Sequence, residues 1–185
     1  MPCFTQFELG GQMTDREVGS MTAALCDPLE LSPSCDALDV FDALNELDCF
    51  GLRGGVAVLV DSQIVVSRGC CTGIEDWREL HDILKCESPW MGHDPAPWCE
   101  FPDQNSVRFW ADGGGSCQHL GPTVLFSQTQ IAEELQQFHN ALLGTVQRFR
   151  QWLAVAGCRC TDSLVEKFDQ SLAITSHEPL YKIVT

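Results

Sequence analysis

Hydrophobic residues recur along the chain at two spacings, which predict a succession of helices and strands. Spacings of three and four residues predict helices over Thr14–Leu25, Asp36–Asp48, Ile74–Lys85, Gln128–Ala156 and Asp162–Leu172. Thr14 and Glu17 have the spacing of a capping box, and Ser34 or Asp36 is suited to cap the second helix. The longest helix carries one apolar stripe: Ile131, Leu135, Phe138, Leu142, Val146, Phe149 and Leu153.

Alternating and β-branched runs predict the strands. Gly55–Val60 and Gln63–Ser67 flank Asp61 and Ser62, which is typical of a tight hairpin. Further strands are predicted over Cys3–Leu9, Trp98–Phe101, Val107–Asp112 and Pro122–Phe126. We therefore expect an α+β fold, with an antiparallel sheet packed by helices on one side and a long helix near the C-terminus.

Length and composition favour one domain spanning residues 1–185. The hydrophobic fraction of 44% is ordinary for a globular protein. No apolar run approaches the ~20 residues of a membrane span, and the first residues lack the basic and apolar regions of a signal peptide, so a cytoplasmic location is expected. Most of the eleven cysteines are accordingly interpreted as reduced thiols.

The formal net charge is −15, which argues against nucleic acid or an anionic membrane as a partner. Residues 1–50 hold ten acidic side chains and one basic side chain, Arg16, for a local charge of −9. Such acidity serves either as a solvated face or as a surface matched to a basic partner.

Residues 69–112 contain four of the five tryptophans, two of the five histidines and four of the eleven cysteines. Pro89, Pro95 and Pro97 make the middle of this segment a stiff loop. We expect Trp90, His93, Asp94 and Trp98 to form one ordered cluster with buried indoles, either packing locally or presenting rigid aromatics to a partner.

Cysteine and histidine also permit metal or thiol chemistry in this segment. Cys70, Cys71, His81 and His93 are the main candidates, and Cys86 and Cys99 are further ones. Adjacent cysteines do not have the usual spacing of a zinc site, so no metal or other cofactor is assigned. A metal- or thiol-dependent protein built on these residues remains the alternative reading.

Gly69-Cys70-Cys71, Asp76-Trp77, residues 88–95 (SPWMGHDP) and residues 107–112 resemble a group of small uncharacterised bacterial proteins that look like cytoplasmic immunity proteins of polymorphic toxin systems. The resemblance implies a non-enzymatic protein that occludes a toxin, with a nuclease-type toxin favoured by the charge. The expected partner-binding residues are Asp39, Asp42, Glu46, Asp48, Trp90, His93, Asp94, Trp98 and Trp110. The partner is expected to be basic at the contact.

Overall fold

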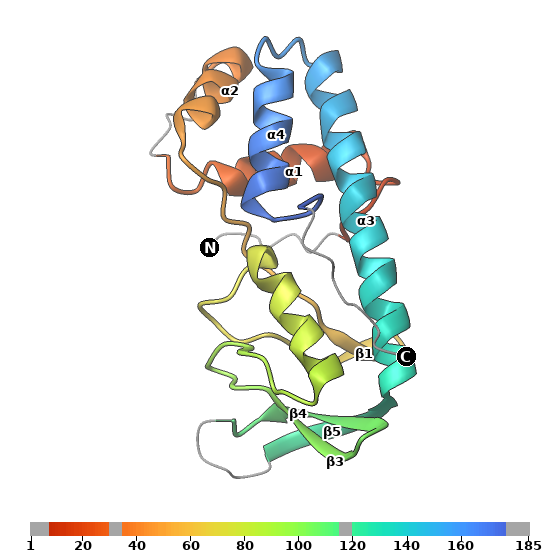
Figure 1. The fold of residues 1–185 in the computed structure, drawn as a ribbon. Helices are drawn as coiled ribbons and strands as arrows, with labels where there is room; N and C mark the ends of the chain where they lie inside the picture. The colour runs from red at the N-terminus through yellow and green to blue at the C-terminus, as the bar shows by residue number, and fades with distance from the viewer. Residues whose placement is uncertain (1–7, 30–34, 115–119, 177–185) are drawn as a thin grey trace. The chain divides into compact units, whose positions relative to one another are not determined.

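A computed structural model describes residues 8–29, 35–114 and 120–176 (Figure 1). The elements follow in the order α1 (Asp15–Leu25), α2 (Ala37–Glu46), β1 (Val58–Val60), β2 (Gln63–Val66), η1 (Ile74–Lys85), β3 (Trp98–Asp103), β4 (Ser106–Asp112), β5 (Leu120–Ser127), α3 (Gln128–Val155) and α4 (Thr161–Ser171). The fold is α+β, as predicted. Along the described residues, none of the helices combines the length and apolar character that a membrane crossing requires.

Residue contacts divide the chain into two compact units. Among the described residues, the first unit comprises those between 8 and 52 together with residues 138–176, and the second comprises those between 53 and 137. The division falls inside α3, whose first turns belong to the second unit. The prediction of one domain over residues 1–185 stays a prediction.

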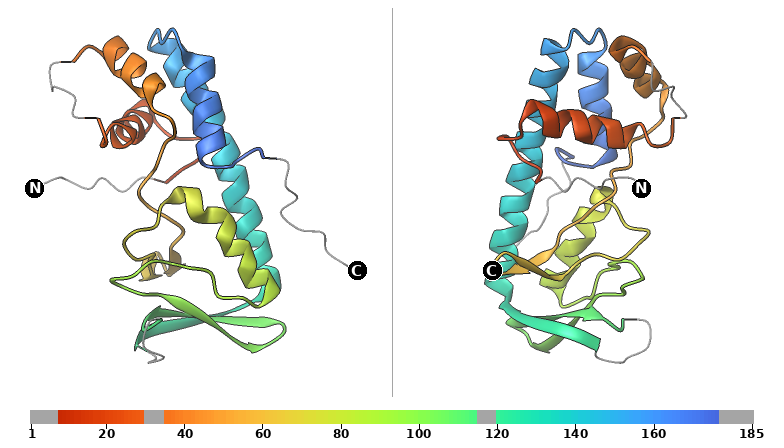
Figure 2. Two further views of the ribbon diagram at one scale, coloured as in Figure 1. Left: turned by 60° about the vertical axis from the view of Figure 1, so that its left-hand side comes forward. Right: turned by 180° about the vertical axis from the view of Figure 1, so that it is seen from behind.

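The first unit is helical (Figure 2). Aromatic side chains join its helices. Phe41 of α2 packs edge-on against Trp152 of α3 at 5.8 Å between ring centroids. The ring centroids of Phe149 of α3 and Phe168 of α4 lie 5.3 Å apart with the ring planes tilted by 50°, and both side chains are fully buried. The predicted stripe of α3 therefore faces the interior of this unit along residues 142–153.

Side-chain caps set the start of the first two helices. The Thr14 hydroxyl accepts from the Glu17 N–H, and the Glu17 carboxylate accepts from the Thr14 N–H at 2.7 Å, which completes the predicted capping box. Asp36 accepts from the Leu38 N–H at 2.9 Å and caps α2. Both caps satisfy amide groups that a helix cannot pair internally.

The second unit holds both antiparallel sheets, one of order β1-β2 and one of order β3-β4-β5. Asp61 and Ser62 both have positive φ, as the tight turn of the predicted hairpin requires. The observed strands β1 and β2 are shorter than predicted, whereas β3, β4 and β5 equal or exceed their predicted lengths. Of the segment Cys3–Leu9, residues 3–7 lie outside the described residues.

One face of the larger sheet builds the core of the second unit. Cys99, Val107 and Phe109 lie on this face and pack with Leu80 and Ile83 of η1 and with Ile131 and Leu135 of α3. Figure 1 shows η1, in yellow-green, beside the first turns of α3 above this sheet. Residues 74–85 form a 3₁₀ helix, and Cys86, with φ 59°, ends it in the left-handed conformation.

Candidate functional site

Two segments of the second unit, residues 68–73 and 90–95, run antiparallel and are joined through their backbones; together they are called the Cys70–His93 clasp. The Cys70 N–H donates to the His93 carbonyl at 2.7 Å, and the His93 N–H donates back at 3.4 Å. The Gly69 N–H donates to the Met91 carbonyl at 2.8 Å. These bonds fix the separation of the two segments.

Glycine is required at two positions of the clasp because the backbones approach so closely. A Cβ at Gly69 would lie 2.6 Å from the His93 nitrogen. A Cβ at Gly92, whose φ is +90°, would lie 2.6 Å from the Cys70 oxygen. Any side chain at either position would push the segments apart.

The Arg68 guanidinium ties the clasp to the helix that follows it. This side chain is 4% exposed and donates to the Gly73 carbonyl at 2.9 Å and to the Trp90 carbonyl at 3.3 Å. Its charge lies 3.8 Å from the Asp76 carboxylate. Burial lowers the pKa of the Arg68 guanidinium, and the negative charge of Asp76 opposes that change.

Three metal-ligating side chains meet on the exposed side of the clasp. Cys70 Sγ lies 3.2 Å from His93 Nδ1 and 3.7 Å from Cys71 Sγ, and the three ligand atoms all lie within 4.8 Å of one another. Cys71 has φ 65°, a left-handed conformation that turns the chain between the two cysteines. In an extended chain, adjacent side chains point to opposite sides. The turn at Cys71 instead brings both thiols to the same side as the His93 imidazole.

The surroundings of Cys70 disfavour the thiolate form of its side chain. Desolvation by neighbouring protein atoms raises its pKa, and the hydrogen bond with Cys71 adds to that effect. A nucleophilic cysteine requires the opposite shift, because the thiolate is the reactive form. The raised pKa argues against thiol catalysis, and the convergence of three ligand atoms is the feature that supports metal ligation.

The other residues of the metal hypothesis lie elsewhere. His81 is buried, packs edge-on against Trp77 at 5.5 Å and places its Nδ1 3.2 Å from the Arg78 carbonyl. Cys86 is exposed at the end of η1, and Cys99 belongs to the core, where burial raises its pKa to about 12. Within the described part of the chain, the ligand group contains Cys70, Cys71 and His93 alone.

The expectation that the indoles are buried is wrong for Trp90. Trp90 is 56% exposed, and its ring lies 6.0 Å from that of His93. Trp98 instead stacks on Trp110 of the neighbouring strand at 6.3 Å, since the two residues are cross-strand partners. Pro89 and Met91 are buried on either side of Trp90, so the fold buries the flanks and leaves the indole outside.

The remaining predicted partner-binding residues are placed on surfaces. Asp94 is exposed and has φ 55°, and the half-buried Trp110 lies on the sheet face opposite the core. In the first unit, Asp39, Asp42, Glu46 and Asp48 are all exposed on α2 or just after it. These acidic residues and the clasp belong to different units and are treated as separate surfaces.

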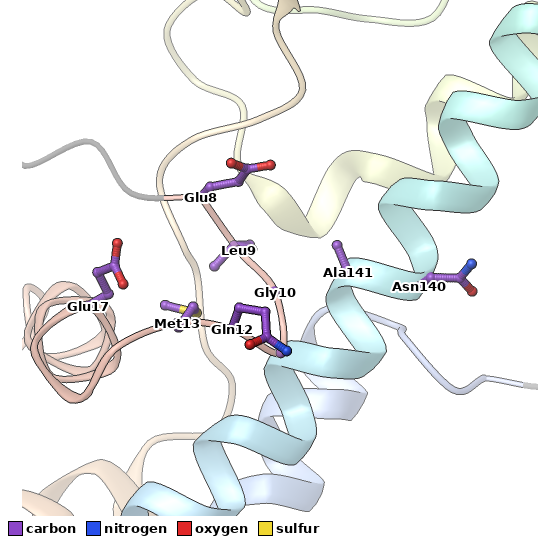
Figure 3. A pocket seen from close by; sticks show the side chains of 9 residues that line it. Glu8, Leu9, Gly10, Gln12, Met13, Glu17, Asn140 and Ala141 are labelled. Atoms are coloured by element: carbon purple, nitrogen blue, oxygen red, sulfur yellow. The ribbon is translucent and has the colours of Figure 1, made fainter.

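A pocket of ≈ 550 Å³ in the first unit was not foreseen from the sequence. It is lined by residues 8–13, Glu17, Asn140 and Ala141 (Figure 3). Gly11 packs directly on Gly144 of α3, where a Cβ would lie 2.6 Å from the Gly11 nitrogen. The Gly10-Gly11 run was therefore the one sequence feature that indicated a close approach of backbones beside this pocket. Figure 3 shows the Asn140 amide pointing away from the segment that carries Glu8, Leu9 and Gln12.

Cys158 and Cys160 form a second close pair of thiols, in the first unit, with 3.5 Å between their sulfurs. Both are half-buried, and the Cys160 Sγ lies 3.7 Å from the Phe41 carbonyl. Burial, followed by the hydrogen bond with Cys158, raises the pKa of Cys160 to about 11. No histidine or acidic group completes a ligand set there among the described residues.

Comparisons with family models, with curated proteins and with solved structures found no match to this chain. Its functional assignment therefore rests on the residues and geometry described above.

Proposed function

We propose that the chain is a non-enzymatic binding protein that occludes a protein toxin acting in the cytoplasm, as immunity proteins do. The exposure of Trp90 is the observation that carries the proposal. A tryptophan that leaves 56% of its surface in water gives up most of the stability that burying its ring would bring. Such a side chain is well suited to fill a pocket on a partner.

The backbone beneath Trp90 supports this role. Its carbonyl accepts from the buried Arg68 guanidinium, and its neighbours Pro89 and Met91 are buried. An anchor whose backbone is already fixed loses little conformational entropy on binding. Tryptophan is also among the residues most enriched at binding hot spots.

Charge supports a basic partner. The exposed carboxylates of Asp39, Asp42, Glu46 and Asp48 give α2 an acidic surface on a chain of net charge −15. Electrostatic attraction of this kind mainly raises the association rate. A toxin that acts on nucleic acid needs a basic surface to approach phosphates, so a nuclease-type toxin fits best.

Co-expression of the chain with a candidate toxin, sought among the genes beside its own, tests the proposal. We expect the intact chain to protect cells and to form a purifiable complex, and we expect Trp90→Ala to weaken binding by ~2 kcal/mol or more, about 30-fold. Leu125→Ala is the matched control, because Leu125 is 55% exposed in the same unit. Equal binding by both variants would refute the role of Trp90.

The acidic surface is tested by stopped-flow association across a salt series. Raising the ionic strength should slow association by at least about tenfold, because screening removes the long-range attraction. Charge reversal at Asp39 and Asp42 should do the same at low salt. A salt-independent rate would assign the acidity to solubility and remove the support for a nuclease-type toxin.

A further inference from the structure

We propose that Cys70, Cys71 and His93 form a zinc site whose fourth coordination position faces solvent. The proposal is independent of the toxin-binding function, because its ligands and its test involve no partner protein. It rests on the distances between the ligand atoms, on the backbone that holds them and on their exposure.

The ligand distances fit a tetrahedral ion. With zinc–sulfur bonds of about 2.3 Å and zinc–nitrogen bonds of about 2.0–2.1 Å, two sulfurs lie about 3.8 Å apart and a sulfur and a nitrogen about 3.6 Å apart. The observed separations are 3.7 Å between the two sulfurs and 3.2 Å between Cys70 Sγ and His93 Nδ1. All three ligand atoms lie within 4.8 Å of one another, which places them around a common point.

The supporting backbone is built for close approach. Gly69 and Gly92 admit no side chain, the reciprocal bonds of Cys70 and His93 fix the register, and the Thr72 hydroxyl donates to the Gly69 carbonyl at 3.0 Å. The left-handed conformation at Cys71 places the second sulfur beside the first. Ligands held in this way need little rearrangement on binding.

Exposure and charge favour a cation at this position. Cysteine is among the residues most often buried, yet Cys70 and Cys71 are both exposed and lie outside the core of their unit. The negative charge of Asp94 acts on Cys70 and attracts a positive ion. The site is open to entry from solvent, because all three ligands are exposed.

Two thiolates and one imidazole select zinc over hard cations. Mg²⁺ and Ca²⁺ require oxygen ligands, whereas thiolate and imidazole suit Zn²⁺. Binding replaces the two thiol protons, so each zinc ion releases two protons to solvent and the neutral imidazole donates its Nδ1 lone pair. Water completes the tetrahedron in the free protein.

The test uses the full chain, prepared with a phosphine reductant and stripped of metal, and titrated with Zn²⁺ against a chromophoric chelator. We expect one zinc ion per chain. Each of the variants Cys70→Ser, Cys71→Ser and His93→Gln should lower the zinc affinity by more than about 100-fold, because even residues that only hydrogen-bond to metal ligands contribute about 10–100-fold. Co²⁺ should give sulfur-to-metal charge-transfer absorption that is weaker in each single cysteine variant and lost when both cysteines are replaced.

Two variants serve as controls. Cys86→Ser removes an exposed thiol that is also in the left-handed conformation, and Cys158→Ser with Cys160→Ser removes the other thiol pair. Both should bind zinc as the intact chain does, and Mg²⁺ should not compete. Far-ultraviolet circular dichroism and melting temperature confirm that each variant is folded.

Three results would overturn the proposal. One is a reduced, folded chain that takes up no zinc at micromolar concentrations. Another is stoichiometric binding that survives in the Cys70, Cys71 and His93 variants. The third is a Cys70–Cys71 disulfide that persists in the chain prepared with reductant, as shown by mass spectrometry.

Discussion

Two thiol pairs among the described residues have similar local structures and differ in what surrounds them. In each, a glycine precedes the first cysteine and a threonine follows the second; Thr72 donates to the Gly69 carbonyl and Thr161 to the Cys158 carbonyl, both at 3.0 Å. The sulfurs lie 3.7 Å apart in the exposed pair and 3.5 Å apart in the half-buried pair. Only the exposed pair has an imidazole within hydrogen-bonding distance.

This difference shows that proximity of sulfurs does not by itself make a site. Cys160 lies against the Phe41 carbonyl, and among the described residues no histidine completes a ligand set with Cys158 and Cys160. Cys70 is exposed and lies beside Cys71 and His93. These three side chains together supply three ligand atoms. The third ligand comes from a segment that is distant in sequence, so it depends on the clasp.

The largest effect on stability and zinc binding is expected from adding a side chain at Gly92, where the two segments of the clasp are in close contact. Gly92→Ala should lower the free energy of unfolding by more than about 3 kcal/mol, because strain at positive φ adds to overpacking against the Cys70 carbonyl. Zinc affinity should fall by about 100-fold in the molecules that remain folded. Chemical denaturation and zinc titration measure the two effects.

Gly157→Ala is the matched control beside the other thiol pair. Gly157 has φ +74°, but a Cβ there would meet nothing within 4 Å. Its replacement should cost only ~1 kcal/mol of left-handed strain and leave zinc affinity unchanged. Equal costs for the two variants would mean that the close approach at Gly92 contributes nothing.

An effect of intermediate size is expected in alkylation by iodoacetamide. With its pKa raised from 9.0 to about 11, Cys160 should react about 100-fold more slowly at pH 8 than an ordinary thiol, because only the thiolate attacks. Its rate should rise about tenfold per pH unit between pH 8 and 10, where the thiolate fraction grows in that proportion.

Mass spectrometry of each cysteine peptide follows this reaction. Added zinc should protect Cys70 and Cys71 and leave the rate at Cys160 unchanged. A Cys160 that reacts at the ordinary rate at pH 8 would show that its surroundings do not hold the proton. Zinc protection at Cys160 would erase the distinction between the two pairs.

The smallest effect is expected from the paired threonine hydroxyls. Thr72→Val and Thr161→Val each remove one hydrogen bond to a backbone carbonyl and should each cost ~1 kcal/mol of stability. Only Thr72→Val should weaken zinc binding. If the ~1 kcal/mol of this hydrogen bond stabilises the clasp in the form that binds zinc, its loss lowers the zinc affinity by about fivefold. Calorimetric zinc titration of both variants checks this, and equal weakening would contradict a localised site.

Local sequence patterns determined most of the secondary structure. The Thr14–Glu17 capping box, the Asp61-Ser62 turn and the stripe of α3 depend on residues within a few positions of one another, so they could be predicted from the chain. The 3₁₀ geometry of η1 could not, because its apolar spacing also suits an α-helix. The exposure of Trp90 was likewise hidden, since burial depends on what packs around its flanks.

The candidate site depended on tertiary structure. In the sequence, His81 and His93 are equally plausible partners of the cysteines, and adjacent cysteines have poor spacing for one ion. The fold separates the histidines by burying His81 against Trp77 and bonding the backbone of His93 to Cys70. The composition supplied the ligands, whereas Gly69, Gly92 and the left-handed Cys71 gave them a common position, because backbone approach and φ are set by contacts distant in sequence.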